Sequence, residues 1–474
     1  MTPRKIFLFG LCVMTLIFIV SSVFPDEIKM GTFIFRSPNL RTFFETNTKE
    51  YKDIQAIIAS VDTVDFQFED FTVLINDSTD NADIDSVKLK PNVVKISAEN
   101  VYQFEYPPGQ DTLLFPMFRA INSKIQRNKP IRILHYGDSQ IECDRITATI
   151  RNYMQKNYGG HGVGFIPIVP VSDVAITFQK DVSPNWKRFS VLDRNSGTDN
   201  CFGIAGNFAR YSPVNQDDSI AHIGLQPYYA GFRNVHTFTH ARLFYGPSQN
   251  PFTVTINQVN TRTLPAHDNV GSAWWRFETP QNSLDLQLSP SCNLPDMYGI
   301  ALDGERGVAV DNLPIRGSAG IDFSRMDTTQ MREMFRMMDV EMLILQFGAN
   351  VLTTFAGNNY DYYSRRFSRE LHFLKSLKSG LVIIVIGVND ISQNTADGYK
   401  SHPNVVKIRD AQKRAAFEAG CVFWDLYEAM GGENSMPSWA FAEPPLAQKD
   451  FLHFNSGGAK IVGELFCKAW ALEQ

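Results

Sequence analysis

Apolar segments of strand length alternate with amphipathic segments of helix length, and this alternation restricts the fold more than any other feature. The pattern consists of apolar segments at residues 131–136, 341–347, 381–387 and 421–424 and of helical segments at residues 112–125, 362–377, 405–419 and 457–470. The apolar segments have the length and the branched side chains of buried strands. Strands that alternate with helices predict an α/β fold with a mostly parallel sheet covered on both faces.

Between residues 184 and 305 the pattern changes. Short segments such as 253–256 and 284–288 alternate apolar and polar residues, and Gly, Pro, Asn and Ser separate them. This texture is typical of antiparallel strands joined by turns. The sequence therefore predicts an antiparallel β-sandwich inserted into the α/β domain.

Trp274 and Trp275 are neighbours within the predicted sandwich. Successive residues of a strand point to opposite faces, so one indole is expected in the core and the other outside. The outward residue is a candidate for stacking on a sugar. Packing within the sandwich is the alternative for both.

The N-terminus carries an export signal. Arg4 and Lys5 precede an almost uncharged apolar stretch at residues 6–24. A small-residue processing site at residues 20–22 predicts a cleaved signal peptide, whereas the length of the stretch also suits a single membrane anchor. Both interpretations stay open for residues 1–25.

Five regions follow from these patterns. They are the signal peptide or anchor at 1–25, a partly disordered spacer at 26–110, the first part of the α/β domain at 111–183, the sandwich at 184–305 and the second part of the α/β domain at 306–474. The spacer is predicted from polar, turn-forming runs such as residues 76–83.

Charge and cysteine content exclude several classes of protein. The 45 basic and 50 acidic side chains give a net charge of −5, which offers no electrostatic footprint for nucleic acid. The five cysteines after Cys12 are an odd number at wide spacing, so they predict neither a disulfide framework nor a zinc site.

The segment Gly137-Asp138-Ser139 joins the first predicted strand to a predicted helix at 141–146. This position places the Ser139 hydroxyl at the carboxyl edge of a parallel sheet, where ligand crevices lie. The first backbone N–H groups of the helix could face a developing oxyanion. Helix capping by Asp138 and Ser139 is the alternative.

Asp450 and His453 are three residues apart, just before the last predicted helix. A carboxylate that holds one imidazole nitrogen leaves the other free to accept a serine proton. Asn350, after the strand at 341–347, and Gly317, in a glycine turn, are candidate oxyanion donors. An exposed ion pair, a capping Asn and a plain loop glycine are the respective alternatives.

The order Ser139, Gly317, Asn350, Asp450 and His453 resembles that of the SGNH (GDSL-like) hydrolase family. The resemblance implies a flavodoxin-like three-layer fold and ester hydrolysis through an acyl-enzyme. It further implies a Ser139–His453–Asp450 triad and an oxyanion hole made by the Ser139 and Gly317 N–H groups and the Asn350 amide. It implies no metal and no cofactor.

Two residues depart from the usual family pattern. Gln140 stands where many members carry Leu or His, and Arg316 replaces the commoner Asn before the oxyanion glycine.

Segments 135–142, 158–165 and 424–432 resemble an exported bacterial branch of this family. The layout of a hydrolase domain split by a carbohydrate-binding-like β-sandwich, at residues 184–305, resembles that of peptidoglycan O-acetylesterases. This implies a periplasmic or cell-envelope esterase that removes small acyl groups, acetyl above all, from an O-acylated polysaccharide. Acyl transfer by the same triad is one alternative. A non-catalytic carbohydrate-binding protein on a decayed hydrolase scaffold is another.

Overall fold

The computed structural model describes residues 27–30, 33–36, 51–61, 103–122, 129–172, 175–193, 200–213, 220–228, 231–291, 294–355 and 360–473. The predicted signal peptide or anchor at 1–25 lies outside these residues, as does most of the predicted spacer. Within the described ranges, no helix is both long enough and apolar enough to cross a membrane. Strands β1 (Glu27–Met30) and β2 (Phe33–Arg36) pair as an antiparallel hairpin in a unit of their own.

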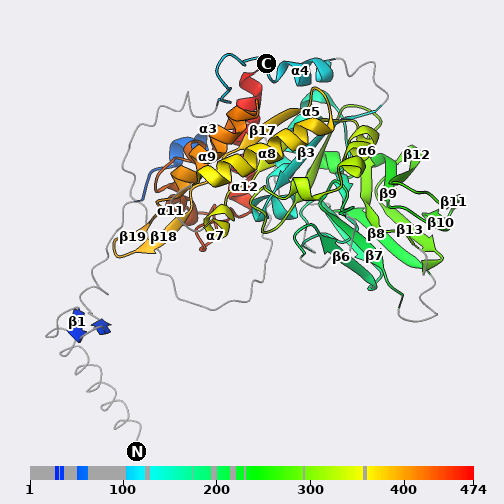
Figure 1. Ribbon diagram of the computed structural model, residues 1–474, viewed down its shortest axis with the longest axis horizontal. Helices are drawn as coiled ribbons and strands as arrows, with labels where there is room; N and C mark the ends of the chain where they lie inside the picture. The colour runs from blue at the N-terminus through cyan, green and yellow to red at the C-terminus, as the bar shows by residue number, and fades with distance from the viewer. Residues whose placement is uncertain are drawn as a thin grey trace, which may run out of the picture. The chain divides into compact units, whose positions relative to one another are not determined.

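The second unit is built on a five-stranded parallel sheet (Figure 1). Its strands lie in the order β15 (Val308–Pro314), β3 (Ile131–Gly137), β16 (Val340–Gln346), β17 (Val382–Ile386) and β20 (Val422–Trp424). Numbered along the chain, this order is 2-1-3-4-5, as in flavodoxin-like folds. The predicted parallel sheet is therefore confirmed, and its chain order reverses next to β3.

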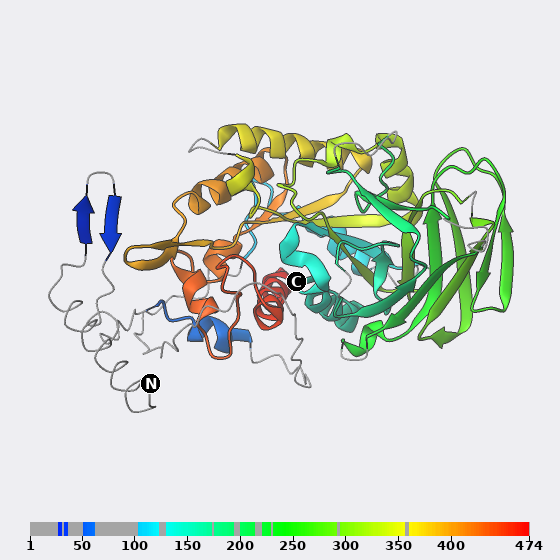
Figure 2. The same cartoon turned by 90° about the horizontal axis from the view of Figure 1, so that it is seen from below.

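Alternate residues of each strand enter two separate cores. On β3, Ile131 and Ile133 pack on the face covered by α5 (Thr147–Tyr158) and α12 (Ser456–Leu472). Leu134 and Tyr136 pack on the opposite face. That face is covered by α6 (Thr328–Met338), α8 (Asp361–Leu377) and α9 (Val405–Glu418). Figure 2 shows the resulting layers, with α8 and α9 (yellow and orange) across the sheet from α12 (red).

Smaller elements complete the second unit. They are α3 (Gln55–Val61), α4 (Phe115–Asn122), α7 (Val351–Thr354), α10 (Leu426–Ala429), α11 (Ser435–Ala440), the β18 (Ser392–Thr395) and β19 (Gly398–Ser401) hairpin, and the 3₁₀ segments η2 (Ser139–Asp144), η3 (Arg233–Val235) and η5 (Phe323–Arg325). Ile57 and Val61 of α3 are buried in the same core as α12. A short piece of the predicted spacer thus belongs to the packed domain.

The predicted sandwich is present as two antiparallel sheets. One has the order β11 (Asn260–Leu264), β10 (Phe252–Ile256), β13 (Leu284–Ser289), β8 (Ala221–Pro227) and β5 (Phe178–Val182). The other has the order β12 (Gly271–Gln281), β9 (Phe238–Tyr245), β14 (Met297–Asp303), β7 (Asn207–Tyr211) and β6 (Trp186–Ser190), with β4 (Gly164–Ile166) paired to β14. Val254, Leu243 and Leu286 lie in the core between them. Strands β4 and β5 belong to these two sheets although they precede residue 184. The domain boundaries given from the sequence stay a prediction.

The outer face of the second sheet packs against the α/β part. Phe244 and Tyr298 belong to the same core as Phe335 of α6. The Tyr298 hydroxyl accepts a hydrogen bond of 2.6 Å from the side chain of Gln330, also in α6. The inserted sandwich therefore shares a continuous hydrophobic core with the α/β part.

The predicted helix at residues 141–146 is wrong. A 3₁₀ segment occupies this stretch, Glu142 and Cys143 have non-helical backbone angles, and the α-helix begins only at Thr147. Cys143 and Asp144 have φ values of 60° and 65°. The Asp144 carboxylate is held by the guanidinium of Arg151, at 2.5 and 3.1 Å, and this side-chain contact is a constraint that local propensity does not express.

Candidate active site

Ser139 lies two residues after the end of β3, at the carboxyl edge of the sheet. The turn before it needs a glycine, because a Cβ at Gly137 would lie 2.7 Å from the Gln346 carbonyl oxygen of the neighbouring strand β16. The Asp138 carboxylate accepts the backbone N–H of Gln140 at 3.0 Å and so caps the 3₁₀ segment. The capping role that the sequence left open belongs to Asp138, and the Ser139 side chain is left for other contacts.

Ser139, His453 and Asp450 form a continuous hydrogen-bonded chain. The Ser139 Oγ lies 2.8 Å from Nε2 of His453, and His453 Nδ1 lies 2.6 Å from Oδ2 of Asp450. Ser139 and His453 are 314 residues apart in the sequence. The structure thus brings together the three residues predicted as a triad, in the order that nucleophilic catalysis needs.

The Asp450 carboxyl is held in its ionised form. Its partial burial acts to raise its pKa, but hydrogen bonds from the His453 ring and from the backbone N–H groups of His453 and Leu452 outweigh burial and leave the pKa below the ordinary value. A carboxylate in this state can fix the tautomer of His453 with the proton on Nδ1.

Two residues that the sequence analysis did not select hold the loop with Asp450 and His453 against the nucleophile turn. The Gln140 side chain donates to the Leu452 carbonyl at 2.6 Å and to the Asn389 amide oxygen at 3.0 Å. The Arg145 guanidinium donates to the backbone carbonyls of Ser139 and Phe454. Gln140 is the family departure noted above, which was the only signal in the sequence that it has a particular role.

Asn350 lies after β16, the strand next to β3. It is the N-terminal capping residue of α7, yet its side chain makes no capping hydrogen bond. Instead its Nδ2 donates to the Ser318 carbonyl at 3.2 Å. Because a side-chain amide nitrogen carries two hydrogens, one remains available for an oxyanion.

Gly317 lies in the loop after β15, on the other side of β3. Its φ of +88° requires a residue without a Cβ, and its N–H makes no hydrogen bond to the described part of the chain. The preceding Ile315 donates its N–H to the Gly137 carbonyl at 2.7 Å, which anchors this loop to the nucleophile turn. The bond from Asn350 to Ser318 brings the second donor candidate to the same loop.

An ion pair links this loop to the turn. The Arg316 guanidinium contacts both carboxylate oxygens of Glu142, which is only 5% exposed, whereas Arg316 is 58% exposed. Paired N–H donors on two carboxylate oxygens give both strength and a fixed geometry. Arg316, the second departure from the family pattern, therefore links the loop of Gly317 to the turn after Ser139.

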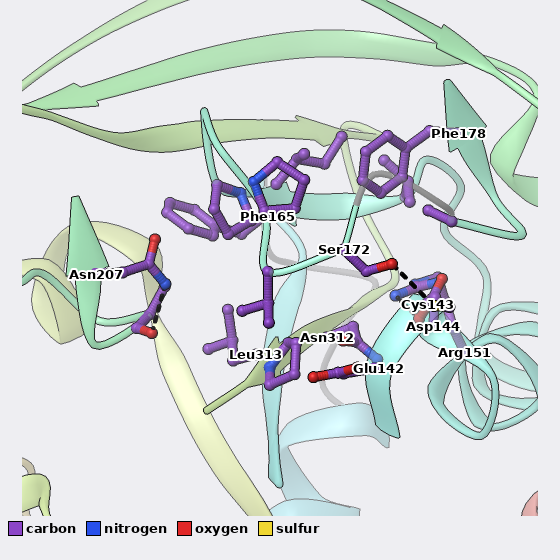
Figure 3. Close-up of a pocket in the computed structure, with 18 residues that line it drawn as sticks. Glu142, Cys143, Asp144, Arg151, Phe165, Ser172, Phe178, Asn207, Asn312 and Leu313 are labelled. Carbon is purple, nitrogen blue, oxygen red and sulfur yellow. Dashed lines mark hydrogen bonds and ion pairs between the residues drawn. The ribbon is translucent and has the colours of Figure 1, made fainter. Parts of the chain in front are cut away.

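A cavity of about 50 Å³ lies beside the nucleophile turn (Figure 3). Glu142 and Cys143 line it from the turn, Asn312 from β15, and Phe178 and Asn207 from the sandwich. The members of the hydrogen-bonded triad do not line it. The inserted sandwich thus lies against the turn that carries the nucleophile candidate.

The structure does not bring the tryptophan pair to the triad. Trp275 is buried in the sandwich, at 6% exposure, and Trp274 points outward, at 58% exposure, so the predicted alternation is confirmed. Trp274 lies near Lys129 and Pro130, which precede β3, whereas Ser139 follows the other end of that strand.

Comparison with known proteins identifies the fold. No family model and no curated protein matches the chain. A solved structure of a peptidoglycan O-acetylesterase is similar with a TM-score of 0.60 and 20% identity, over 76% of this chain and 95% of that chain. An acetyl xylan esterase (TM-score 0.27, 13% identity, 34% of this chain and 81% of that chain) and a GDSL-like lipase from Parabacteroides merdae (TM-score 0.26, 15% identity, 35% and 74%) are also similar. The chain has an SGNH hydrolase-like α/β fold, as the sequence predicted.

Proposed function

We propose that the protein is an exported serine esterase that removes acetyl groups from a cell-wall or other polysaccharide. The observation that carries this proposal is the chain of hydrogen bonds from Ser139 through His453 to Asp450. It lies where the strand order of the sheet reverses, outside the carboxyl ends of the strands. Open α/β sheets bind their ligands in that crevice.

In the acylation step, the Ser139 oxygen attacks the ester carbonyl while His453 Nε2 takes the hydroxyl proton. The negative charge that develops on the carbonyl oxygen is stabilised by the N–H groups of Ser139 and Gly317 and by the Asn350 amide. The bond between the acyl carbon and the sugar oxygen then breaks, and His453 returns the proton to that oxygen. The products are the free sugar hydroxyl and an acyl-enzyme on Ser139.

In the second step, water attacks the acyl-enzyme and His453 accepts a proton from it. The same donors stabilise the second tetrahedral oxyanion. Its collapse releases the carboxylic acid, and His453 returns the proton to the Ser139 oxygen. Asp450 stays ionised in both steps and stabilises the imidazolium that forms transiently.

The substrate class rests on two lines of support. The solved structure that is similar over most of this chain is a peptidoglycan O-acetylesterase, and the chain shares its fold. The inserted sandwich also offers an outward indole that suits a sugar. Export rests on the charged and apolar pattern of residues 1–25.

The test measures acetate released by the purified protein from O-acetylated peptidoglycan and from acetylated xylan. Ser139→Ala should lower the release of acetate by several orders of magnitude, because a triad without its nucleophile loses activity on that scale. Ser376→Ala is the matched control. The Ser376 hydroxyl lies exposed on α8, so its removal should leave the release of acetate unchanged. A Ser139→Ala protein that keeps more than about a tenth of the activity and melts normally would remove the triad from the proposal.

A further inference from the structure

A larger cavity, of about 490 Å³, lies at the edge of the parallel sheet opposite Ser139. Lys129 and Pro130, just before β3, line one side of it, and Trp274 of β12 lines another. Since β3 has seven residues and a strand rises about 3.3 Å per residue, this cavity is roughly 20 Å from Ser139. We call it the far cleft.

Trp274 gives the far cleft an aromatic wall. The indole is 58% exposed, while the neighbouring Trp275 is buried in the sandwich core. The exposed indole lines a cavity of about 490 Å³, where it offers a large apolar face to a ligand. Its flat face suits the C–H groups of a sugar ring.

The charged lining of the far cleft is mostly basic. Five basic residues line it, against two acidic ones; they are Lys129, Arg132, Arg242, Arg276 and Arg306, with Asp303 and Glu305. Some of this charge is matched, because Arg132 pairs with Asp303 and Arg276 pairs with Glu305 at 3.0 Å. Lys129 is also paired, with Asp339 at 3.3 Å, a residue outside the lining. The lining itself carries more basic than acidic side chains, which favours an anionic ligand.

Arg242 has no ion pair with a carboxylate of the described residues. Its guanidinium donates to the Ser272 hydroxyl, at 2.8 and 3.1 Å, and to the Met337 carbonyl, which are neutral acceptors. Burial, together with the nearby Arg132, lowers its pKa to about 10. A cation held against neutral oxygens in a concave site is complementary to an incoming carboxylate.

We infer that the far cleft is a second saccharide site, which binds a sugar unit that carries a carboxylate. The sugar ring lies against Trp274, and its carboxylate faces Arg242 and the neighbouring basic side chains. Because the proposed substrate is a polymer, a site roughly 20 Å from Ser139 can hold one part of a chain while another part reaches the nucleophile. This inference rests on the proposed function only in identifying the polymer as the substrate.

The test is calorimetric titration of the full-length protein with three probes. They are a galacturonic acid hexamer, a neutral xylose hexamer of equal length, and soluble peptidoglycan fragments with free peptide carboxylates. At least one acidic probe should bind at least tenfold more tightly than the neutral hexamer, and Trp274→Ala should weaken that binding at least tenfold. Which acidic probe binds shows whether the carboxylate belongs to the sugar or to an attached peptide.

Matched variants separate this site from the catalytic site. Val259→Ala removes another exposed apolar side chain of the sandwich, at 89% exposure, and should leave binding unchanged. Ser139→Ala should also bind normally, and thermal unfolding shows whether the Trp274→Ala protein is folded. Equal affinity for the neutral hexamer and for both acidic probes, unchanged binding by a folded Trp274→Ala protein, or no binding of either acidic probe would overturn the inference. Loss of esterase activity in Ser139→Ala is a separate result that bears on the proposed function alone.

Discussion

Asp450 holds His453 with one carboxylate oxygen and the backbone of its own loop with the other. Oδ2 lies 2.6 Å from Nδ1 of His453, while Oδ1 accepts the N–H groups of Leu452 and His453, each at 3.0 Å. One side chain therefore fixes both the ring and the loop that carries it. Because Asp450 precedes His453 by three residues, its carboxylate can reach both the backbone N–H and the ring of His453.

This arrangement predicts the effect of Asp450→Asn. If the amide oxygen keeps the two backbone bonds, the amide NH₂ group faces Nδ1 and forces the ring proton onto Nε2, which then cannot accept from Ser139. We expect kcat for 4-nitrophenyl acetate to fall on the order of 10⁴-fold, with near-normal thermal unfolding. Asp397→Asn, at an exposed pair with Lys400, is the control. A loss of less than tenfold would show that Asp450 does not set the tautomer.

The Glu142–Arg316 pair predicts a positioning effect. Glu142→Gln leaves the geometry of the turn but removes the charge that holds Arg316, and with it the loop of Gly317. Small displacements of a catalytic donor cost up to about 10²-fold, so we expect kcat to fall roughly 10- to 100-fold with little change in KM. Steady-state kinetics on a small soluble ester measures this split.

Glu333→Gln is the matched control for this variant, because it breaks an ion pair with Arg336 on the exposed surface of α6. It should leave kcat and the melting temperature unchanged. The Glu142–Arg316 pair would be merely structural if Glu142→Gln lowered the melting temperature and the folded fraction kept its full kcat.

The sequence predicted the parallel sheet, the sandwich and the three triad residues because these depend on local patterns and on motif order. It could not identify Gln140 or Arg145 as positioning residues, because their partners at Leu452 and Phe454 lie more than 300 residues away. The helix predicted at residues 141–146 failed because the Asp144–Arg151 ion pair, between side chains seven residues apart, holds a left-handed backbone there. Specific side-chain contacts of either kind leave no periodic signal in the sequence.

Asn350→Ala distinguishes an oxyanion donor from a capping residue. A donor that bonds the oxyanion of the transition state lowers kcat by roughly 10²–10³ when it is removed and leaves KM nearly unchanged. Loss of a cap costs about 0.5–2 kcal/mol of stability and does not act on the chemical step. Since the Asn350 side chain makes no capping bond, we expect the kinetic result.

Kinetics and thermal unfolding of the same Asn350→Ala preparation provide the measurement. Asn157→Ala is a suitable control, because that amide lies exposed and bonds only within its own helix. A lower melting temperature with an unchanged kcat per folded molecule would assign Asn350 a structural role and remove one donor from the oxyanion hole.

His135 is a fully buried imidazole within β3, with Nδ1 2.9 Å from the Thr147 hydroxyl. Burial, with the Arg151 charge nearby, lowers its pKa to about 3. Since the unfolded chain binds this proton near pH 6.5, His135 favours the folded state fully above that pH, and this contribution is lost as the pH falls toward 3. Burial raises the pKa of Asp138 and of Asp425 to about 6, and their contribution is present at low pH and lost as the pH rises through 6.

The contributions of His135 and of the two aspartates to the stability change in opposite directions with pH. Comparison of the wild type with His135→Gln isolates the contribution of His135, so we predict how this variant changes the pH dependence of stability. Between pH 7 and pH 5 residue 135 of the wild type binds a proton in the unfolded state but not in the folded state. This difference lowers the free energy of unfolding by about 2 kcal/mol. The glutamine cannot titrate, so the variant should lose about 2 kcal/mol less than the wild type over this range, whatever its absolute stability. Urea unfolding of both proteins at the two pH values measures the difference. Parallel losses would show that His135 is already protonated in the folded protein at pH 5.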